Sequence, residues 1–473
     1  MRHTLLALAC LALAAGTSCT QRPAAPTADA PSPIAAPWSH GQLRVSDNHR
    51  YLCHADGTPF YWQGETGWLL PLQTDTADVN LYLRRCREEG YNVVQVQTVS
   101  NIRQLDSAAY WQNMDYIVRR AEHEGIYIGM VCIWGGMVKA GLLSVDAAQA
   151  YGTFLADRYG ARPNIVWIIG GDQPGDVRPD VWSALAEAIR AKDSTHLMTY
   201  HPRGRTLSAT WWNEAPWLDF NMFQSGHRSY GQVKVKPGQE DAETLDDPAT
   251  VHEDGWRYVA EALAMTPLKP VLDGEPSYER IPHGLHDPAA PKWHAADCRR
   301  YAWWSVLAGS CGHTYGNNAL MQFYNPDTHR AADGTLTPGA YGCTTSWREA
   351  IGDTGFCQMK YLPQLLLRLP YFDRMPDQTV LVGPYGERYE RPVASRGSDY
   401  ILVYTYTSAP LRLDLNRISG QTKRAWWYSP TDGTLTPIGD FPTSADQLFT
   451  PLQPHADGHD AVLVVTDAES RYL

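Results

Sequence analysis

The chain has 473 residues, of which 44% are hydrophobic, and carries a formal net charge of −11 at pH 7. This hydrophobic fraction excludes global disorder, and the acidic balance argues against a nucleic-acid partner, which normally needs a basic surface. The length exceeds one ordinary domain and suits a large barrel with a smaller module. The 17 Trp and 26 Tyr suit stacking against sugar rings, although most of them are expected in the core.

Residues 1–18 have the pattern of a bacterial lipoprotein signal. Arg2 supplies a positive charge, LLALACLALAAG an apolar run, and GTSC small residues before a cysteine. The apolar run is too short to span a membrane, and no later stretch has the roughly 20 apolar residues needed. We predict cleavage before Cys19 and lipidation of its thiol, with residues 19–37 as a Pro/Ala-rich tether. This lipid anchor would be the only membrane contact, at the periplasmic or outer surface of the cell envelope.

Seven of the nine cysteines follow Cys19. They are Cys53, Cys86, Cys132, Cys298, Cys311, Cys343 and Cys357. None forms a Cys-x-x-Cys pair or a regular spacing with histidine, so a structural zinc site is not expected. The odd number leaves at least one free thiol, and a Cys343–Cys357 bridge stays open.

Residues 38–371 are predicted to form a (β/α)8 barrel. Short alternating runs up to residue 60, with an Asp56-Gly57 turn, favour a small β-hairpin at its entry. Eight strand-like runs then alternate with helical segments, which is the count of such a barrel. The strands are expected at 60–68, 92–99, 127–134, 165–172, 196–203, 219–226, 270–276 and 310–316. The clearest helices are expected at 76–90, 111–125, 144–160 and 180–193.

Residues 372–473 follow a different pattern. Runs such as DYILVYTYTS and HDAVLVVTD are short, alternate in polarity and are separated by turn residues. No long helix is predicted among them. The pattern favours a small all-β domain, most simply a sandwich.

Two strand ends carry the residues that suggest chemistry. NIVWIIGGD runs apolar and then ends in Asp172, and KPVLDGEP ends with Glu275 and a proline. In (β/α)8 barrels, active sites lie at the carboxyl ends of the strands. Glycoside hydrolysis needs one acid to protonate the leaving oxygen and one carboxylate at the anomeric carbon. The two residues therefore form a candidate catalytic pair.

Other roles stay open for both residues. Asp172 could cap the helix that follows, and Glu275 could be an ion-pair partner of Arg203 or Lys269. Rival carboxylates are Asp273 and Glu279, near Glu275, and Glu65, at the end of the first predicted strand.

Polar and aromatic side chains stand at the predicted ends of all eight strands, as a pocket for a polyhydroxylated ligand requires. As substrate-binding residues we predict Glu65, Trp68, Gln97, Trp134, His201, Arg203, Gln224, His227, His313 and Tyr315. A metal site built from Asp172, His201, His227 and His313 is conceivable by composition, but their spacing carries no metal signature. The chain has no G-x-S-x-G elbow, Walker loop or dinucleotide-binding glycine motif after the first strand. No cofactor or metal is therefore predicted.

Six ordered segments carry a family resemblance: WQGETGWLL, NIVWIIGGD, HLMTYHPRG, WLDFNMFQSGH, KPVLDGEPSYE and AGSCGHTYG. They resemble the apiosidase-like glycoside hydrolases, glycoside hydrolase family 140 and its close relatives. The resemblance implies a (β/α)8 barrel followed by a β-sandwich that is often labelled collagen-binding, and RAWWYSPTDGTLTPIGDF resembles the motif of that second domain. It also implies an exo-acting enzyme of pectin side-chain breakdown, with Asp172 as acid/base and Glu275 as nucleophile.

One departure concerns the fourth strand. Related retaining barrel glycosidases normally end it in Asn-Glu, whereas this chain has Gly171-Asp172, which draws the carboxyl back by one methylene. A retaining outcome is predicted. Alternatives are a carbohydrate-binding lipoprotein without catalysis, a barrel glycosidase for another sugar, and an adhesin acting through the C-terminal domain.

Overall fold

The computed structural model describes residues 36–230, 232 and 253–473. The predicted signal, Cys19 and nearly all of the predicted tether lie outside this part of the chain. Within it, no helix combines the length and the apolar character that crossing a membrane would require.

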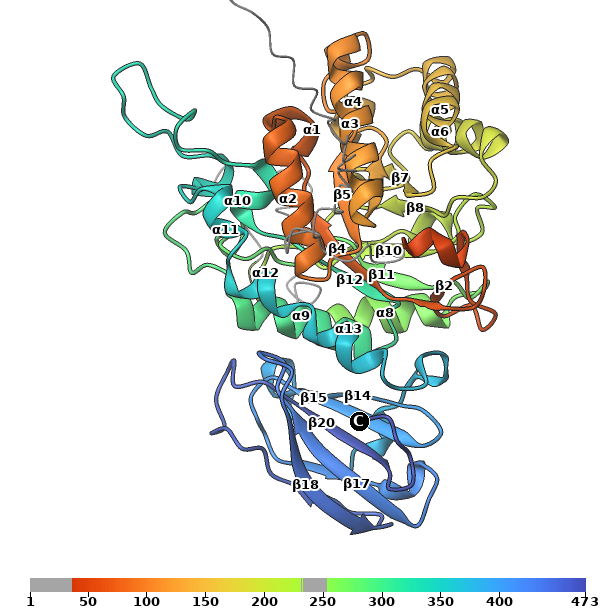
Figure 1. The fold of residues 1–473 in the computed structure, drawn as a ribbon, viewed down its shortest axis with the longest axis vertical. Helices are drawn as coiled ribbons and strands as arrows, with labels where there is room; N and C mark the ends of the chain where they lie inside the picture. Colours follow the sequence, from red (N-terminus) through yellow and green to blue (C-terminus); the bar gives the residue numbers. More distant parts are fainter. Residues whose placement is uncertain (1–35, 231, 233–252) are drawn as a thin grey trace, which may run out of the picture. The chain divides into compact units, whose positions relative to one another are not determined.

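Eight parallel strands form the barrel, and each lies inside one of the predicted segments (Figure 1). They are β4 (Trp62–Thr66), β5 (Val93–Gln97), β6 (Tyr127–Val131), β7 (Ile165–Gly170), β8 (Met198–His201), β10 (Asn221–Gln224), β11 (Val271–Asp273) and β12 (Gly312–Tyr315). The paired order runs β8-β7-β6-β5-β4-β12-β11-β10, and the short β9 (Thr206–Leu207) adds antiparallel to β10. The barrel prediction is confirmed, and the carboxyl ends of all eight strands meet at one mouth.

The edges β8 and β10 are joined by individual hydrogen bonds rather than by regular strand pairing. The backbone N–H of Asp219 donates to the carbonyl oxygen of Met198 at 2.9 Å, and Thr199 Oγ1 donates to that of Phe220 at 2.7 Å. These bonds close the curled sheet where β8 and β10 face each other.

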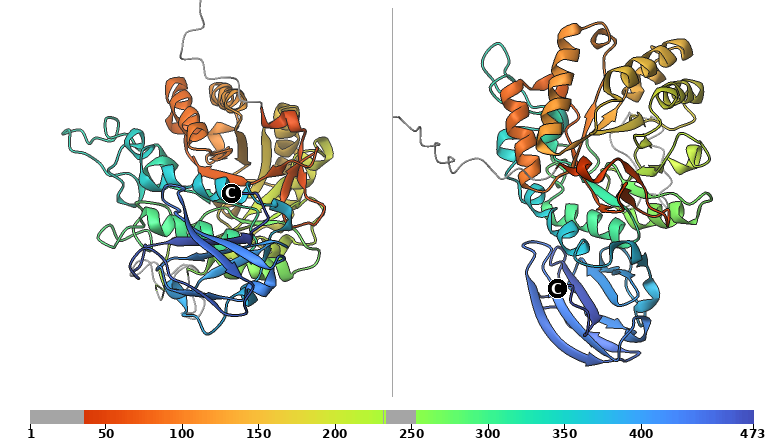
Figure 2. Two further views of the ribbon diagram at one scale, coloured as in Figure 1. Left: turned by 60° about the horizontal axis from the view of Figure 1, so that its bottom comes forward. Right: turned by 45° about the vertical axis from the view of Figure 1, so that its right-hand side comes forward.

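The four predicted helices are confirmed, with ends that differ by at most three residues from the expected ones. They are α2 (Thr76–Glu88), α3 (Ala108–Glu124), α5 (Val145–Tyr159) and α6 (Pro179–Lys192). Gly125 ends α3 in the left-handed region with φ 74°, where a residue without Cβ is favoured. Ser144 caps α5 by accepting from the N–H of Ala147 at 3.2 Å. The helices lie outside the parallel strands, as the views of Figure 2 show.

The remaining helices of the described residues are mostly short. They are α1 (Leu70–Gln73), α4 (Gly135–Lys139), α7 (Ala209–Trp212), α8 (Gly255–Ala264), α9 (Ala295–Leu307), α10 (Asn318–Gln322), α11 (Trp347–Ala350), α12 (Thr354–Gln358) and α13 (Tyr361–Leu366). The predicted entry hairpin is confirmed and has a third strand: β1 (Leu43–Val45), β2 (Leu52–His54) and β3 (Pro59–Phe60) are antiparallel. Its Asp56-Gly57 turn joins β2 to β3, with Gly57 at φ 87°.

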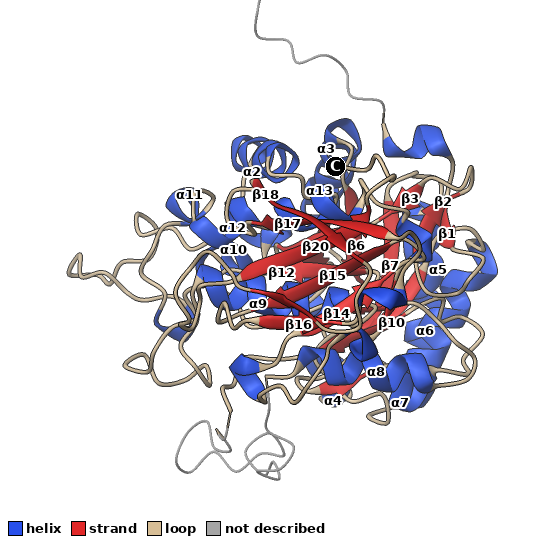
Figure 3. Ribbon diagram, turned by 90° about the horizontal axis from the view of Figure 1, so that it is seen from below, coloured by secondary structure: helices blue, strands red, loops and turns tan. Residues whose placement is uncertain are grey.

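The C-terminal region is antiparallel β structure, as predicted. Six strands form one sheet: β13 (Met375–Pro376), β14 (Val393–Arg396), β15 (Tyr400–Thr405), β20 (Ala461–Asp467), β17 (Thr422–Tyr428) and β18 (Leu435–Pro442). A second sheet pairs β16 (Leu411–Leu413) with β19 (Gln447–Phe449). In Figure 3, β15, β20 and β17 lie side by side.

Both faces of the six-stranded sheet are buried. On one face Ile401 and Val403 pack in a cluster with Leu411 and Phe449 of the small sheet, so the two sheets form a sandwich of unequal size. On the other face the rings of Tyr404 and Trp303 of α9 stack, with centroids 5.8 Å apart and planes 3° apart. An ion pair supports this face: Arg299 donates two bonds, of 2.7 and 2.8 Å, to the carboxylate of Asp460.

All seven cysteines of the described residues are free thiols. Cys343 is buried and Cys357 is partly buried, and neither is bridged. The open possibility of a disulfide between them is therefore not realised in this structure.

Candidate active site

Glu275 follows β11 and is held between two histidines. Its side chain is 9% exposed, with Oε2 lying 3.1 Å from Nε2 of His201 and Oε1 lying 3.0 Å from Nε2 of His227. Burial by itself raises the pKa of this carboxyl, but the contacts with the two imidazoles outweigh it and lower the pKa to about 2. Glu275 is therefore an anion over the whole physiological pH range.

Asp172 follows β7 on a sharply turned segment. Gly170, Gly171 and Asp172 have φ of 91°, 115° and 61°, so three consecutive residues lie outside the region that side chains favour. A Cβ at position 170 would lie 2.5 Å from the carbonyl oxygen of His201, which only a glycine avoids. The two glycines of the motif thus let the chain turn beside β8 and leave Asp172 at the mouth of the barrel.

The imidazole of His201 contacts both residues, through the backbone of Asp172 and the carboxylate of Glu275. The backbone N–H of Asp172 donates to Nδ1 of His201 at 3.4 Å, while Nε2 of the same ring faces Glu275. Desolvation and then the negative charge of Glu275 raise the pKa of Asp172 to about 7, against the opposing charge of Arg203 and a hydrogen bond from Gln224. Below about pH 7 Glu275 is therefore ionised while Asp172 is mostly protonated, which is the division that acid–base work at a pair of carboxyls needs.

Aromatic rings line the side of this group. The ring of Trp68 meets that of His201 edge-on at 5.3 Å, and the ring of Trp134 lies 5.6 Å from that of Trp68. Trp68 Nε1 donates to the hydroxyl of Tyr278 at 3.1 Å, and the Tyr278 ring packs on His227 at 4.7 Å. The structure confirms that both predicted tryptophans lie with the histidines, and it adds Tyr278, which sequence reasoning missed although it stands three residues after Glu275.

Three glutamines lie around the carboxyl pair, and they differ in whether they contact a site side chain or the backbone. Gln224, at the end of β10, bonds the Asp172 side chain. Gln97 is 9% exposed, and its backbone N–H donates to the carbonyl oxygen of Trp68 at 3.0 Å. Gln95, also missed from the sequence, lies two residues earlier on the same face of β5. Its Nε2 donates to the carbonyl oxygen of Gly274 at 2.8 Å and so fixes the residue before Glu275.

Three predicted substrate-binding residues lie elsewhere, and their assignment is corrected. One strand face carries Glu65, His313 and Tyr315, because Tyr315 registers with Glu65 and lies two residues after His313. This face points away from the barrel interior, toward the helices, since Glu65 lies near Cys86 of α2. Glu65 is fully buried close enough to Cys86 of α2 for its charge to raise the pKa of that thiol. The hydroxyl of Tyr315 donates to Glu279 at 2.5 Å. His313 is buried without a hydrogen-bond partner for either ring nitrogen among the described residues, and burial lowers its pKa to about 3.

The contacts of the neighbouring residues decide the other roles that the sequence left open. Asp273 accepts from Ser225 Oγ at 2.6 Å, and Glu279 accepts from Tyr315, so neither rival carboxylate joins the group. The residue capping α6 is Arg178 rather than Asp172, and Lys269 donates to backbone carbonyls rather than to Glu275. In the part of the chain that the structure describes, no three His, Cys, Asp or Glu side chains are arranged to hold a metal ion.

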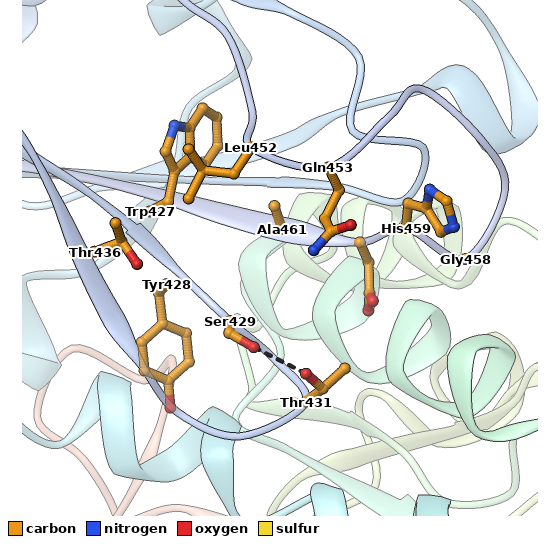
Figure 4. Close-up of a pocket in the computed structure, with 11 residues that line it drawn as sticks. Trp427, Tyr428, Ser429, Thr431, Thr436, Leu452, Gln453, Gly458, His459 and Ala461 are labelled. Atoms are coloured by element: carbon orange, nitrogen blue, oxygen red, sulfur yellow. Dashed lines mark hydrogen bonds between the residues drawn. The ribbon is translucent and has the colours of Figure 1, made fainter.

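A second hollow, of about 200 Å³, lies in the C-terminal domain between the end of β17 and residues 452–461 (Figure 4). Its one carboxylate, Asp460, is already bound by Arg299. Ser429 and Thr431 on its rim bond each other at 2.9 Å. Its lining therefore holds no pair of carboxylates like Asp172 and Glu275 at the mouth of the barrel.

Comparison with known proteins decides the family. The family model described as "Apiosidase-like, catalytic domain" matches residues 46–373, which is most of the chain. The chain belongs to the apiosidase-like family. A second model, "Putative collagen-binding domain of a collagenase", matches residues 375–466. The carboxyl pair and the aromatic wall lie within the apiosidase-like domain.

Solved structures agree with this family. One described as "Glycoside hydrolase" is 49% identical, with a TM-score of 0.86 over 92% of this chain and 99% of its own. A glycoside hydrolase family 5 protein from Bacteroides vulgatus ATCC 8482 is 47% identical, with a TM-score of 0.86 over 92% of this chain and 96% of its own. A comparison with curated proteins found no match. This apiosidase-like protein is a glycoside hydrolase.

Proposed function

We propose that the chain is an exo-acting, retaining glycoside hydrolase of apiosidase type that acts on pectic side chains of the plant cell wall. In this proposal Glu275 is the nucleophile and Asp172 the acid/base. The observation that carries the two roles is the placement of Glu275 between two imidazoles, with Nε2 of His201 and of His227 lying 3.1 and 3.0 Å from its oxygens. These contacts lower the pKa of Glu275, whereas desolvation and then the charge of Glu275 raise the pKa of Asp172.

In the first half of the reaction the Glu275 carboxylate attacks the anomeric carbon and the protonated Asp172 gives its proton to the leaving glycosidic oxygen. A covalent glycosyl-enzyme and a free alcohol result. In the second half, ionised Asp172 takes a proton from water, which attacks the anomeric carbon and releases Glu275 as carboxylate. Two displacements at one carbon keep its configuration.

The histidines support this scheme in different ways. His227 and His201 hold the two oxygens of Glu275, which fixes the direction of attack and keeps the nucleophile ionised. Once Glu275 becomes an ester it loses its charge, and the repulsion that raises the pKa of Asp172 disappears. The pKa of Asp172 then falls, so the acid of the first step becomes a base for the second.

The substrate class and the exo mode rest on family membership and on the aromatic wall of Trp68 and Trp134, which suits a sugar ring. The experiment is digestion of apiose-containing pectic oligosaccharides, with products separated by chromatography and the first-formed anomer read by proton NMR. We expect release of a terminal monosaccharide with its configuration retained. An inverted product would remove the nucleophile role from Glu275.

Variants test the two roles. Glu275→Gln and Asp172→Asn each remove one reacting group, and turnover is expected to fall by about 10²–10⁴-fold or more. The matched control is Glu261→Gln, because Glu261 is exposed on α8. Sugar binding without any product release by the unaltered protein would instead favour the carbohydrate-binding alternative.

We also propose that the protein is anchored to the cell envelope by lipid on Cys19. The support is the sequence pattern of residues 1–19. Mass spectrometry of the N-terminal peptide from the native host is expected to show a diacylglyceryl cysteine. Cys19→Ser is expected to move the protein out of the membrane fraction. An unmodified Cys19 at the mature N-terminus would contradict the proposal.

A further inference from the structure

A tyrosine from a distant part of the chain is bonded to the helix that follows β12. Tyr341 belongs to the short helical turn η3 (Ala340–Gly342) and has φ 54° and ψ 35°, a left-handed conformation that costs a non-glycine residue of order 1 kcal/mol or more. Such conformations persist only where the surroundings impose them, and they cluster at ligand-binding segments.

The surroundings that impose it come from α10, which begins three residues after β12 and so stands at the mouth of the barrel. Gln322 bonds the residue before the tyrosine twice: Oε1 accepts from the N–H of Ala340 at 2.7 Å, and Nε2 donates to its carbonyl oxygen at 3.2 Å. Asn318 Nδ2 donates to the carbonyl oxygen of Tyr341 at 3.3 Å. Two side-chain amides therefore hold the turn in place by its backbone.

The side chain of Tyr341 packs on a second segment, the one between β11 and α9. Its ring packs on that of His286, with centroids 5.9 Å apart and planes at 48°. The segment of His286 is tied to the site, because the N–H of Gly284 donates to the carbonyl oxygen of His227 at 2.8 Å. The ring is thus linked through one short segment to a histidine that grips Glu275.

Tyr341 is partly exposed, and the negative charges of the two site carboxylates act on its hydroxyl. Burial, followed by the negative charges of Asp172 and Glu275, raises its pKa to about 12, so its hydroxyl keeps its proton throughout the working pH range. A neutral donor on a turn that α10 fixes beside the end of β12, with its ring packed on a segment bonded to His227, is arranged to meet a ligand that occupies the site.

We propose that Tyr341 is a substrate-positioning residue, whose phenol donates a hydrogen bond to the sugar held between Asp172 and Glu275 and whose ring covers that sugar at the mouth of the barrel. This inference rests on the proposed function. Residues 339–343 would then contribute to substrate specificity, although they are far in sequence from the other site residues.

The test compares Tyr341→Phe and Tyr341→Ala with the unaltered enzyme on an apiose-containing pectic oligosaccharide. Tyr341→Phe is expected to raise KM about 10-fold and leave kcat within about 3-fold, because the bond is made to ground state and transition state alike. Tyr341→Ala also loses the ring and is expected to lower kcat/KM about 100-fold. The control is Tyr116→Phe in α3, which removes a hydroxyl that donates to Asn80 at 2.8 Å in the outer helix layer.

A binding measurement separates this inference from the proposed function. Calorimetry with the same oligosaccharide compares Glu275→Gln with the double variant that also carries Tyr341→Phe, and about 10-fold weaker binding by the double variant is expected. Equal affinities, or an unchanged KM in Tyr341→Phe with its melting temperature intact, would overturn the role of Tyr341. Absence of cleavage by the unaltered enzyme would defeat the proposed function, and the binding pair would still decide Tyr341.

Discussion

Replacing His227 with phenylalanine probes the pairing that defines the site. The substitution keeps a ring against Tyr278, where the centroids lie 4.7 Å apart, but removes the nitrogen that lies 3.0 Å from Glu275 Oε1. A hydrogen bond to a charged group contributes about 1.5–3 kcal/mol, and one pKa unit corresponds to about 1.4 kcal/mol. The pKa of Glu275 is therefore expected to rise by about one to two units from its present value of about 2.

The sign of the effect on activity follows from the role of Glu275. The nucleophile must be ionised, so kcat/KM falls as the pH drops through its pKa. In the unaltered enzyme that fall lies near pH 2, where acid unfolding intervenes, and little acid limb is expected above pH 4. In His227→Phe the limb is expected between about pH 3 and 4, while the alkaline limb set by Asp172 stays near pH 7.

The assay is kcat/KM from pH 3 to 9, with the melting temperature measured at each pH. His123→Gln serves as control, because that imidazole is 70% exposed on α3. An active, folded His227→Phe enzyme whose acid limb coincides with that of the unaltered enzyme would refute the claim that His227 lowers the pKa of Glu275.

Three further predictions concern support of the site and of the fold. Trp68→Phe keeps the ring but loses the N–H that donates to Tyr278, and kcat/KM is expected to fall about 5–10-fold in steady-state kinetics. Arg299→Ala leaves the buried Asp460 carboxylate without its partner and is expected to lower the free energy of unfolding by about 3–5 kcal/mol in denaturant titration. Burial raises the pKa of Glu65, so stability should decline as pH rises above about 4.3, by up to about 1.4 kcal/mol per unit, and Glu65→Gln should remove that slope.

Each of these has an outcome that contradicts it. A Trp68→Phe enzyme with unchanged kinetics would show that the bond to Tyr278 has no part in the site. For Arg299→Ala the comparison is Arg424→Ala, which breaks an exposed pair with Asp440 and should leave stability unchanged; equal effects of both would count against a special role for burial. A Glu65→Gln variant with the same dependence of stability on pH as the unaltered protein would place the titrating group elsewhere.

Much of the fold could be read from local pattern. Apolar runs such as Ile165–Ile169, which ends at two glycines, indicate buried strands. Helices with three- and four-residue spacing end where Gly90 and Gly125 permit a left-handed turn. Because these strands alternate with helices along the chain, the sequence predicted a parallel barrel. It also predicted that the acids at the strand ends would lie at the mouth of that barrel. The C-terminal β domain followed from alternation in the same way.

The sequence did not decide which side chains face the pocket. Glu65, His313 and Tyr315 stand at strand ends like Gln97 and His201, but a strand alternates its side chains, and only the pairing register assigns each residue to a face. A shift of one residue in the expected strand reverses the assignment.

Contacts across the barrel were likewise decided by tertiary structure. The sequence marks Asp172 and Glu275 as strand-end acids, and both keep that place. Their different pKa values depend on His201, at the end of β8, and His227, after β10, both reaching Glu275 after β11, a meeting in space that no local pattern encodes. The local sequence determines where the strands end. The tertiary structure determines which charged groups meet at those ends, because a pKa is set by neighbours in space rather than in sequence.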